Sequence, residues 1–235
     1  MHLPEPGRRS ALLWKWPRIL LLSLKLPLLL LGVSVLVCAD INPQKLQETM
    51  HDRYGDGGIA LLDAWQRMLV DANRKSTEDK LVLVNQFFNR HVRYTEDAIL
   101  WKKSDYWATP LELLGQRAGD CEDYTIAKYL SLLELGFSNQ QLRLVYVKAR
   151  IGGVQSKIFQ AHMVLGYYPT PDAVPLILDS LIDTIEPANQ RPDLQPVFSF
   201  NSQGLWIGNQ ETTADPTARL SRWRDLLARV REEGF

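Results

Sequence analysis

Residues 119–147 read GDCEDYTIAKYLSLLELGFSNQQLRLVYV, and the sequence changes character within this stretch. Its first part repeats apolar residues at helical spacing, at Ile126, Leu130 and Leu133. The helical pattern stops at Gly136, and residues 142–147 are then rich in the aliphatic, β-branched and aromatic residues typical of a strand. The stretch therefore predicts a helix that begins at Cys121 and a strand that follows it closely.

The same change divides the whole chain, because helical patterns precede this stretch and strand patterns follow it. The expected helices lie at about residues 43–53, 59–69, 77–92, 110–118 and 216–232, and glycines at 55–58 separate the first two. The expected strands lie at residues 142–147, 162–167, 176–179, 198–200 and 205–207. Helices followed by antiparallel strands predict an α+β fold, in which the helix that begins at Cys121 packs across the sheet.

The first 39 residues differ from the rest and predict a secretory signal peptide. Four basic residues precede an apolar run, which ends in the small-residue sequence Val37-Cys38-Ala39. The run is short for a bilayer span, but if Lys25 is tolerated, residues 19–37 would instead remain as an N-terminal membrane anchor. Residues 40–235 are then the folded domain, and the chain's 46% hydrophobic and 23% charged residues are ordinary for a globular protein.

Loss of this segment changes both the charge and the cysteine content of the chain. Residues 1–39 hold five of the 27 basic and one of the 27 acidic residues, so removing them leaves a formal charge of −4. That charge gives no indication of a nucleic-acid partner. Removal also takes one of the two cysteines and leaves Cys121 as a lone thiol. In an oxidising compartment such a thiol is either a buried, inert side chain or a reactive one.

The predicted place of Cys121 at a helix start suits a nucleophile, because free N–H groups and the positive end of the helix dipole stabilise a thiolate. Three neighbouring acids, Asp120, Glu122 and Asp123, act in the opposite sense and raise the pKa expected for the thiol. A protonated histidine near the sulfur, or a cation bound by the carboxylates, would offset them. The acids also have a simpler explanation, since acidic residues in a first turn stabilise the helix dipole.

A candidate base and a candidate orienting acid lie on two of the predicted strands. Of the three histidines after residue 40, His162 begins an apolar strand, and the other two lie on predicted helices. Asp179 ends a neighbouring strand, where a carboxylate can orient an imidazole, and Asp183 competes for the same role. Taken singly, His162 also fits a half-buried structural histidine, and Asp179 fits the start of a turn. Together with Cys121 they supply a cysteine, a histidine and an aspartate in that order.

In four places the chain resembles the bacterial transglutaminase-like cysteine proteinases, and among them the LapG type. The matching sequences are Trp107-Ala108-Thr109-Pro110, Gly119-Asp120-Cys121-Glu122-Asp123, Ala161-His162-Met163-Val164-Leu165 and Leu178-Asp179-Ser180. The resemblance covers about residues 45–210, and the acidic block around Cys121 with the downstream Ala-His pair is its most specific part. It implies a papain-related, transglutaminase-like fold with the nucleophile helix packed on an antiparallel sheet.

The resemblance further implies the chemistry and the setting of the protein. It implies a triad of Cys121, His162 and Asp179, and a calcium requirement with Asp120, Glu122 and Asp123 as the acidic ligands. Calcium would account for the clustered acids, because it prefers oxygen ligands. The implied activity is that of a periplasmic endopeptidase that cuts the N-terminal region of a large surface adhesin near a pair of alanines and so promotes biofilm dispersal. The implied partner is the periplasmic domain of an inner-membrane cyclic-di-GMP receptor, and we expect a monomer or a weak dimer.

Two alternatives remain open at this point. The same triad would support acyl transfer to an amine, as in a transglutaminase or an amidase, and the sequence does not separate water from an amine as the acceptor. A transglutaminase-like domain can also be a non-catalytic binding module, although the presence of all three triad residue types counts against it.

Overall fold

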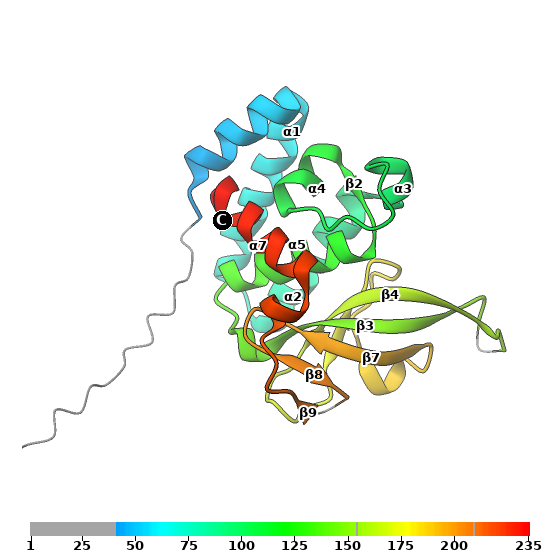
Figure 1. Cartoon of the computed structure of the whole chain (residues 1–235). Helices are drawn as coiled ribbons and strands as arrows, with labels where there is room; N and C mark the ends of the chain where they lie inside the picture. The colour runs from blue at the N-terminus through cyan, green and yellow to red at the C-terminus, as the bar shows by residue number, and fades with distance from the viewer. Residues whose placement is uncertain (1–40, 154, 209) are drawn as a thin grey trace, which may run out of the picture. The chain divides into compact units, whose positions relative to one another are not determined.

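The computed structural model describes residues 41–153, 155–208 and 210–235 (Figure 1). Residues 1–39, where the sequence predicts a signal peptide or an anchor, lie outside the described residues. Within the described part of the chain, no helix has both the length and the hydropathy that crossing a bilayer requires.

Helices make up the first half of the described chain (Figure 1). They are α1 (Pro43–Asn73), α2 (Thr77–His91), α3 (Asp97–Leu100), α4 (Pro110–Gln116) and α5 (Cys121–Glu134), and α6 (Pro216–Arg219) and α7 (Ser221–Glu233) follow the sheet. The local sequence sets several of their starts, because the side chains of Asn42, Ser76 and Thr109 accept hydrogen bonds from backbone N–H groups of α1, α2 and α4.

The predicted break between two helices at residues 55–58 is confirmed at Gly55. The label α1 covers Pro43–Asn73, but the backbone of Gly55 is not helical (φ 62°, ψ −159°), so α1 consists of two helical segments joined by a sharp kink. Buried residues on both sides of the kink, Met50 and Leu61 among them, belong to the same core and hold the two halves together. The kink therefore lies where the sequence places its glycines, since glycine adopts a positive φ without strain.

An antiparallel sheet forms the second layer, with its strands in the order β6-β5-β4-β3-β7-β8-β9. The strands are β3 (Leu142–Ile151), β4 (Ile158–Tyr167), β5 (Leu176–Leu178), β6 (Glu186–Pro187), β7 (Leu194–Phe200), β8 (Leu205–Ile207) and β9 (Gln210–Glu211). A separate parallel pair, β1 (Arg93–Tyr94) and β2 (Ala118–Gly119), was not predicted. This pair ties the segment before α3 to the segment before α5.

Helix α5 lies between the other helices and the sheet, and it contacts α2 and α4 as well as β3 and β4 (Figure 1). Alternation along β4 explains how the sheet has two apolar faces. Met163 and Leu165 join the main core with the helices, whereas Val164 joins a smaller cluster on the opposite face. The predicted α+β fold, with the helix of Cys121 packed on an antiparallel sheet, is confirmed.

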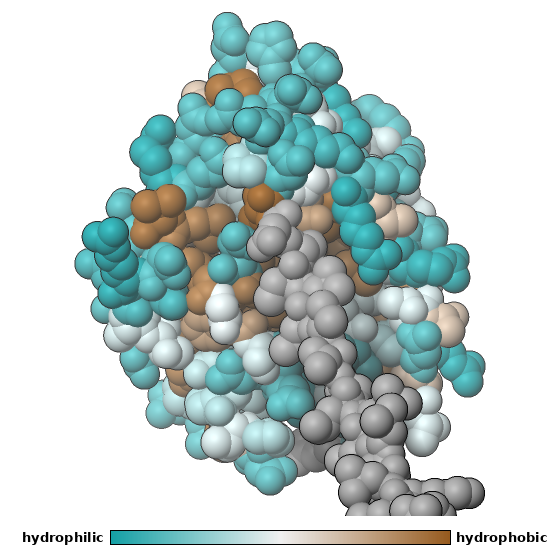
Figure 2. Space-filling model, turned by 90° about the vertical axis from the view of Figure 1, so that its left-hand side faces the viewer, coloured by the Kyte–Doolittle hydropathy of each residue, from teal (hydrophilic) through white to brown (hydrophobic). Residues whose placement is uncertain are grey.

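Apolar side chains on the outer surface occur both in a group and singly. On the face shown in Figure 2, hydrophilic residues cover the upper part and hydrophobic ones gather across the middle. Single large apolar side chains are also exposed, such as those of Val70, Ile99 and Ile158. Isolated apolar side chains are ordinary on protein surfaces, so none of these three alone marks a binding site.

Gly115→Ala is expected to destabilise the fold by about 1–3 kcal/mol. A methyl group at residue 115 would lie 2.3–2.5 Å from ring atoms of Tyr54, where α1 and α4 pack together. Gly57→Ala is the matched control, because a methyl group at residue 57 of α1 meets no atom within 4 Å. That variant should be neutral or stabilising by up to about 1 kcal/mol. Denaturant unfolding of the two variants measures both effects, and equal stabilities would contradict this account of the contact.

Candidate active site

Cys121 is the first residue of α5, and it is 8% exposed. The helix start is held by the side chain of Asp123, whose Oδ2 accepts from the backbone N–H of Asp120 at 3.2 Å. The thiol donates a hydrogen bond to Glu122 Oε2 at 2.7 Å, and the backbone N–H of Met163 is close enough to favour the thiolate. Burial, followed by the charge of Glu122, raises the pKa of Cys121 well above its usual range. In this arrangement the sulfur therefore keeps its proton.

His162 and Asp179 form a buried pair on neighbouring strands of the sheet. His162 lies on β4 and is 4% exposed, and Asp179 directly follows β5 and is fully buried. The ring Nε2 is 2.8 Å from Asp179 Oδ1, and since a carboxylate can only accept, Nε2 carries the proton. This leaves Nδ1 as the ring nitrogen available to a substrate-side group. The structure thus selects Asp179 as the partner of His162, while Asp183 instead accepts from Asn89.

The strand that carries His162 lies next to the thiol, because the backbone of Met163, the following residue, is close to the sulfur and accepts from Thr125 of α5. The structure therefore joins His162 to Asp179 and brings the strand of His162 beside the helix start that carries Cys121. Because the thiol donates to Glu122, a contact with the His162 ring would require the thiol to turn away from that carboxylate.

Asp179 has further partners that the sequence did not indicate. Its Oδ1 accepts from the backbone N–H of Leu181 at 3.0 Å, and its Oδ2 accepts from Arg191 Nη2 at 2.8 Å. Although burial opposes it, the hydrogen bonds from His162, Leu181 and Arg191 hold the pKa of Asp179 well below its usual range. The acid is therefore ionised, as a group that orients an imidazole must be.

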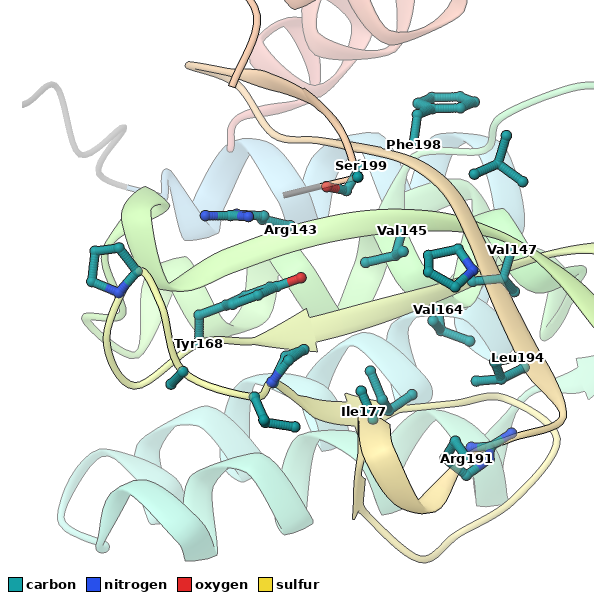
Figure 3. Close-up of a pocket in the computed structure, with 18 of the residues that line it drawn as sticks. Arg143, Val145, Val147, Val164, Tyr168, Ile177, Arg191, Leu194, Phe198 and Ser199 are labelled. Carbon is teal, nitrogen blue, oxygen red and sulfur yellow. The ribbon is translucent and has the colours of Figure 1, made fainter. Parts of the chain in front are cut away.

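Arg191 reaches Asp179 from the face of the sheet that carries Val164. There it borders a cavity of about 480 Å³ together with Val147, Val164 and Leu194 (Figure 3). Its guanidinium is held in place from the far side by both carboxylate oxygens of Asp193. No motif marks Arg191, because only the fold brings it to the acid twelve residues earlier in the chain.

A cluster of carboxylates surrounds the start of α5. Oxygens of Asp97, Asp120 and Asp123 lie within 4.8 Å of one another, and so do oxygens of Asp97, Asp105 and Glu122. The predicted ligands Asp120, Glu122 and Asp123 thus belong to one cluster, which Asp97 and Asp105 complete. No motif marks these two, since they lie on α3 and on the loop before α4 and reach the cluster only through the fold.

The charges and the free oxygens of this cluster fit a cation. Burial, and then repulsion from Glu122 and Asp123, raises the pKa of Asp120 to about 9, and burial raises the pKa of Asp97 to about 6. Oδ1 atoms of Asp97, Asp105 and Asp120 are buried without a hydrogen-bond partner. Asp123 differs, because its oxygens accept from the backbone N–H groups of Ala108 and Asp120. Hard cations such as calcium bind carboxylate oxygens of this kind.

The family model of the bacterial transglutaminase-like cysteine proteinases (BTLCP) matches residues 64–193. The chain belongs to this family. Solved structures of Legionella pneumophila LapG are similar to it at 37% identity: LapG itself with a TM-score of 0.68, EGTA-treated LapG with 0.69 and calcium-bound LapG with 0.68. The first two alignments cover 81% of this chain and 98% of LapG, and the third covers 80% and 99%. No match is found among curated protein sequences.

Membership in the transglutaminase-like cysteine proteinases confirms the predicted family, its fold and its enzyme class. The protein is a cysteine protease, which speaks against the non-catalytic alternative. The roles of Cys121, His162 and Asp179, and of the acidic ligands, stay predictions at this point. The geometry makes each of these roles open to a direct test.

Proposed function

We propose that this transglutaminase-like cysteine proteinase is a calcium-dependent endopeptidase of the periplasm, with Cys121 as nucleophile, His162 as base and Asp179 as the orienting acid. One observation supports this proposal above the others. The thiol at the start of α5 lies beside β4, the strand of the buried His162–Asp179 pair, and beside a cluster of carboxylates with free oxygens. The pair supplies general acid–base chemistry, and the cluster suits a cation.

In the proposed reaction, His162 Nδ1 takes the proton of the Cys121 thiol, and the thiolate attacks the carbonyl carbon of the scissile peptide. The oxyanion that forms is stabilised by the backbone N–H of Cys121, which as a first-turn group of α5 has no partner within the helix. His162 then gives its proton to the leaving amine as the C–N bond breaks. Water hydrolyses the thioester, and its proton returns through His162 to the sulfur. Asp179 keeps the ring oriented and offsets its positive charge throughout.

The resting hydrogen bond between Cys121 and Glu122 explains why a cation matters to this reaction. While Glu122 accepts the thiol proton, the sulfur is not available to His162. Calcium held by Asp97, Asp105, Asp120 and Glu122 would neutralise the repulsion among their carboxylates and lower the cost of ionising the neighbouring thiol. Asp123 is the third predicted ligand. Its oxygens already accept from the backbone N–H groups of Ala108 and Asp120, so it would support the site by holding the backbone at the start of α5 in place.

Chelation is expected to lower the rate of cleavage about 100-fold, and added calcium is expected to restore it. The assay follows an adhesin N-terminal fragment that contains a pair of alanines, with and without EGTA, and identifies products by mass spectrometry. Asp120→Asn removes one predicted ligand and should raise the calcium concentration needed for half-maximal activity. Cleavage at the same rate with and without EGTA would agree with the proposed protease activity and would contradict the proposed calcium site. A heavier intact substrate in place of two fragments would favour acyl transfer to an amine.

The substrate in this proposal is the N-terminal region of a large cell-surface adhesin, whose release promotes biofilm dispersal. The periplasmic domain of an inner-membrane cyclic-di-GMP receptor is the proposed partner that sequesters the enzyme, which acts as a monomer or a weak dimer. The resemblance to the LapG type supports both proposals, together with 37% identity over nearly the whole of LapG. Co-purification of the enzyme with such a receptor domain, in the presence and absence of the nucleotide, tests the second.

A further inference from the structure

Helix α5 carries a buried lysine on the same face as the nucleophile. Lys128 follows Cys121 by seven residues, about two helical turns, and is 1% exposed. Thr125 lies between them on this face, and its hydroxyl meets the carbonyl oxygens of Cys121 and Met163. The face thus runs from the thiol, along β4, to the segment that follows β5.

All three donors of the Lys128 ammonium have an acceptor. Nζ lies 2.8 Å from Asn85 Oδ1, 2.8 Å from Asn89 Oδ1 and 3.0 Å from the backbone oxygen of Asp179. A neutral amine has only two donors, so three acceptors favour the charged form. The lysine therefore joins α5 and α2 to the main chain of the proposed catalytic acid.

The two asparagines of α2 extend this connection to the following residues. Asn89 Nδ2 donates to the backbone oxygen of Asp179 at 3.0 Å and to Asp183 Oδ1 at 3.0 Å. Asn85 Nδ2 donates to the backbone oxygen of Asp183 at 3.0 Å. Each amide thus accepts from Lys128 with its oxygen and holds residues 179–183 with its nitrogen.

Negative charges near Lys128 favour its ammonium form, although burial opposes it. Burial lowers the pKa of Lys128 to about 7, and the negative charges of Asp179 and Asp183 oppose that shift. The helix α2 faces the ammonium with amides only, and α5 itself adds the ring of Tyr124, whose centroid is 5.7 Å away. A buried ammonium costs stability, and an apolar side chain of the same length would avoid that cost.

We propose that Lys128 is a positioning residue for proteolysis. Together with Asn89 it fixes the main chain of Asp179, so that the Asp179 carboxylate holds the His162 ring in the orientation needed for reaction with Cys121. The inference rests on the proposed role of Asp179. Arg191 fixes the carboxylate from one face of the sheet, and Lys128 fixes the carbonyl from the helical side. The backbone carbonyl of Asp179 accepts from Lys128 and from Asn89, so without the lysine it keeps only one of these two hydrogen bonds. A displacement of about 1 Å at a reacting group can cost about 100-fold in rate.

Lys128→Met tests this, because it keeps the length of the side chain and removes its donors. We expect kcat for the adhesin fragment to fall about 10- to 100-fold at saturating calcium, with little change in KM. Asn89→Ala, at a half-buried position, should lower kcat about 3- to 10-fold, since Lys128 remains as a donor to Asp179. Ser131→Ala is the matched structural control. Ser131 is equally buried on α5, but its hydroxyl bonds Trp65 and Ala127, away from the triad.

A spectroscopic measurement separates positioning from a loss of stability. The low-field proton NMR signal of the His162 imidazole in its bond to Asp179, assigned by its loss in His162→Gln, should shift or broaden in Lys128→Met. It should stay unchanged in Ser131→Ala, even where thermal unfolding shows equal destabilisation of the two variants.

The outcomes distinguish this inference from the proposed function. Unchanged kcat and an unchanged imidazole signal in folded Lys128→Met, with Asp179→Asn inactive, would overturn the role of Lys128 alone. Full activity of Asp179→Asn would overturn the triad and, with it, this inference. If Lys128→Met does not fold, a wild-type kcat for Asn89→Ala overturns the inference, and a reduced kcat with an unchanged KM supports it.

Discussion

Cys121→Ala is expected to abolish cleavage of the adhesin fragment, with a fall in rate of at least about 10⁴-fold. The substitution removes the atom that forms the thioester, and neither His162 nor the carboxylate cluster can replace it. The fold should persist, because the residue is small and its thiol, among the described residues, donates only to Glu122. Product formation over hours, measured at saturating calcium, gives the rate, and thermal unfolding confirms the folded state.

Cys121→Ser is the appropriate control for this prediction. A hydroxyl keeps the size of the group and can still donate to Glu122, but it is a weaker nucleophile than a thiolate at neutral pH. The serine variant should therefore match the wild type in stability and resemble the alanine variant in rate. Cleavage at the wild-type rate by either variant would mean that the nucleophile lies elsewhere in the chain.

Asp179→Asn is expected to lower kcat about 10³- to 10⁴-fold while the enzyme remains folded. The amide keeps the shape of the carboxylate but loses the charge that stabilises a protonated His162, and its nitrogen can present a second donor to the ring. Rates at saturating substrate and calcium measure the effect. A variant that retains more than a tenth of the wild-type kcat would contradict the assignment.

The same variant is expected to show a pH-dependent change in stability. Folding lowers the pKa of Asp179, so its carboxylate stabilises the fold above the pKa of the unfolded chain. That contribution is lost as the pH falls toward the lower folded value. The difference in unfolding free energy between wild type and Asp179→Asn should therefore be constant near neutral pH and shrink below about pH 4. A difference independent of pH would show that the carboxylate is not ionised in the fold.

Much of this site could be predicted because its signals are local. A cap, a glycine and an apolar repeat place Cys121 at a helix start, and strand patterns place His162 and Asp179 at positions that neighbouring strands bring together. Ser76 and Thr109 cap helices for the same reason, since their bonds span only three residues. Such features are set by residues that are close to one another in the sequence, so a sequence pattern can reveal them.

The remainder of the site depends on contacts between distant segments. A lysine in a helix is typically a surface residue, and nothing near Lys128 in the sequence shows that its three acceptors come from α2 and from the end of β5. Asp97 and Asp105 reach the carboxylate cluster because the two-residue pair β1–β2 brings the start of α3 beside the start of α5. A pairing this short has no periodic pattern for the sequence to reveal.

The bond from Cys121 to Glu122 also affects how the thiol would stay reduced in the periplasm, the location proposed above, where disulfides form readily. Oxidants and foreign disulfides react with a thiolate far faster than with a thiol. A sulfur that is 8% exposed and donates its proton to a neighbouring carboxylate is therefore shielded from sulfenic acid formation and from mixed disulfides. The hydrogen bond to Glu122 thus keeps the thiol of the only free cysteine among the described residues protonated and reduced until that bond is broken for catalysis.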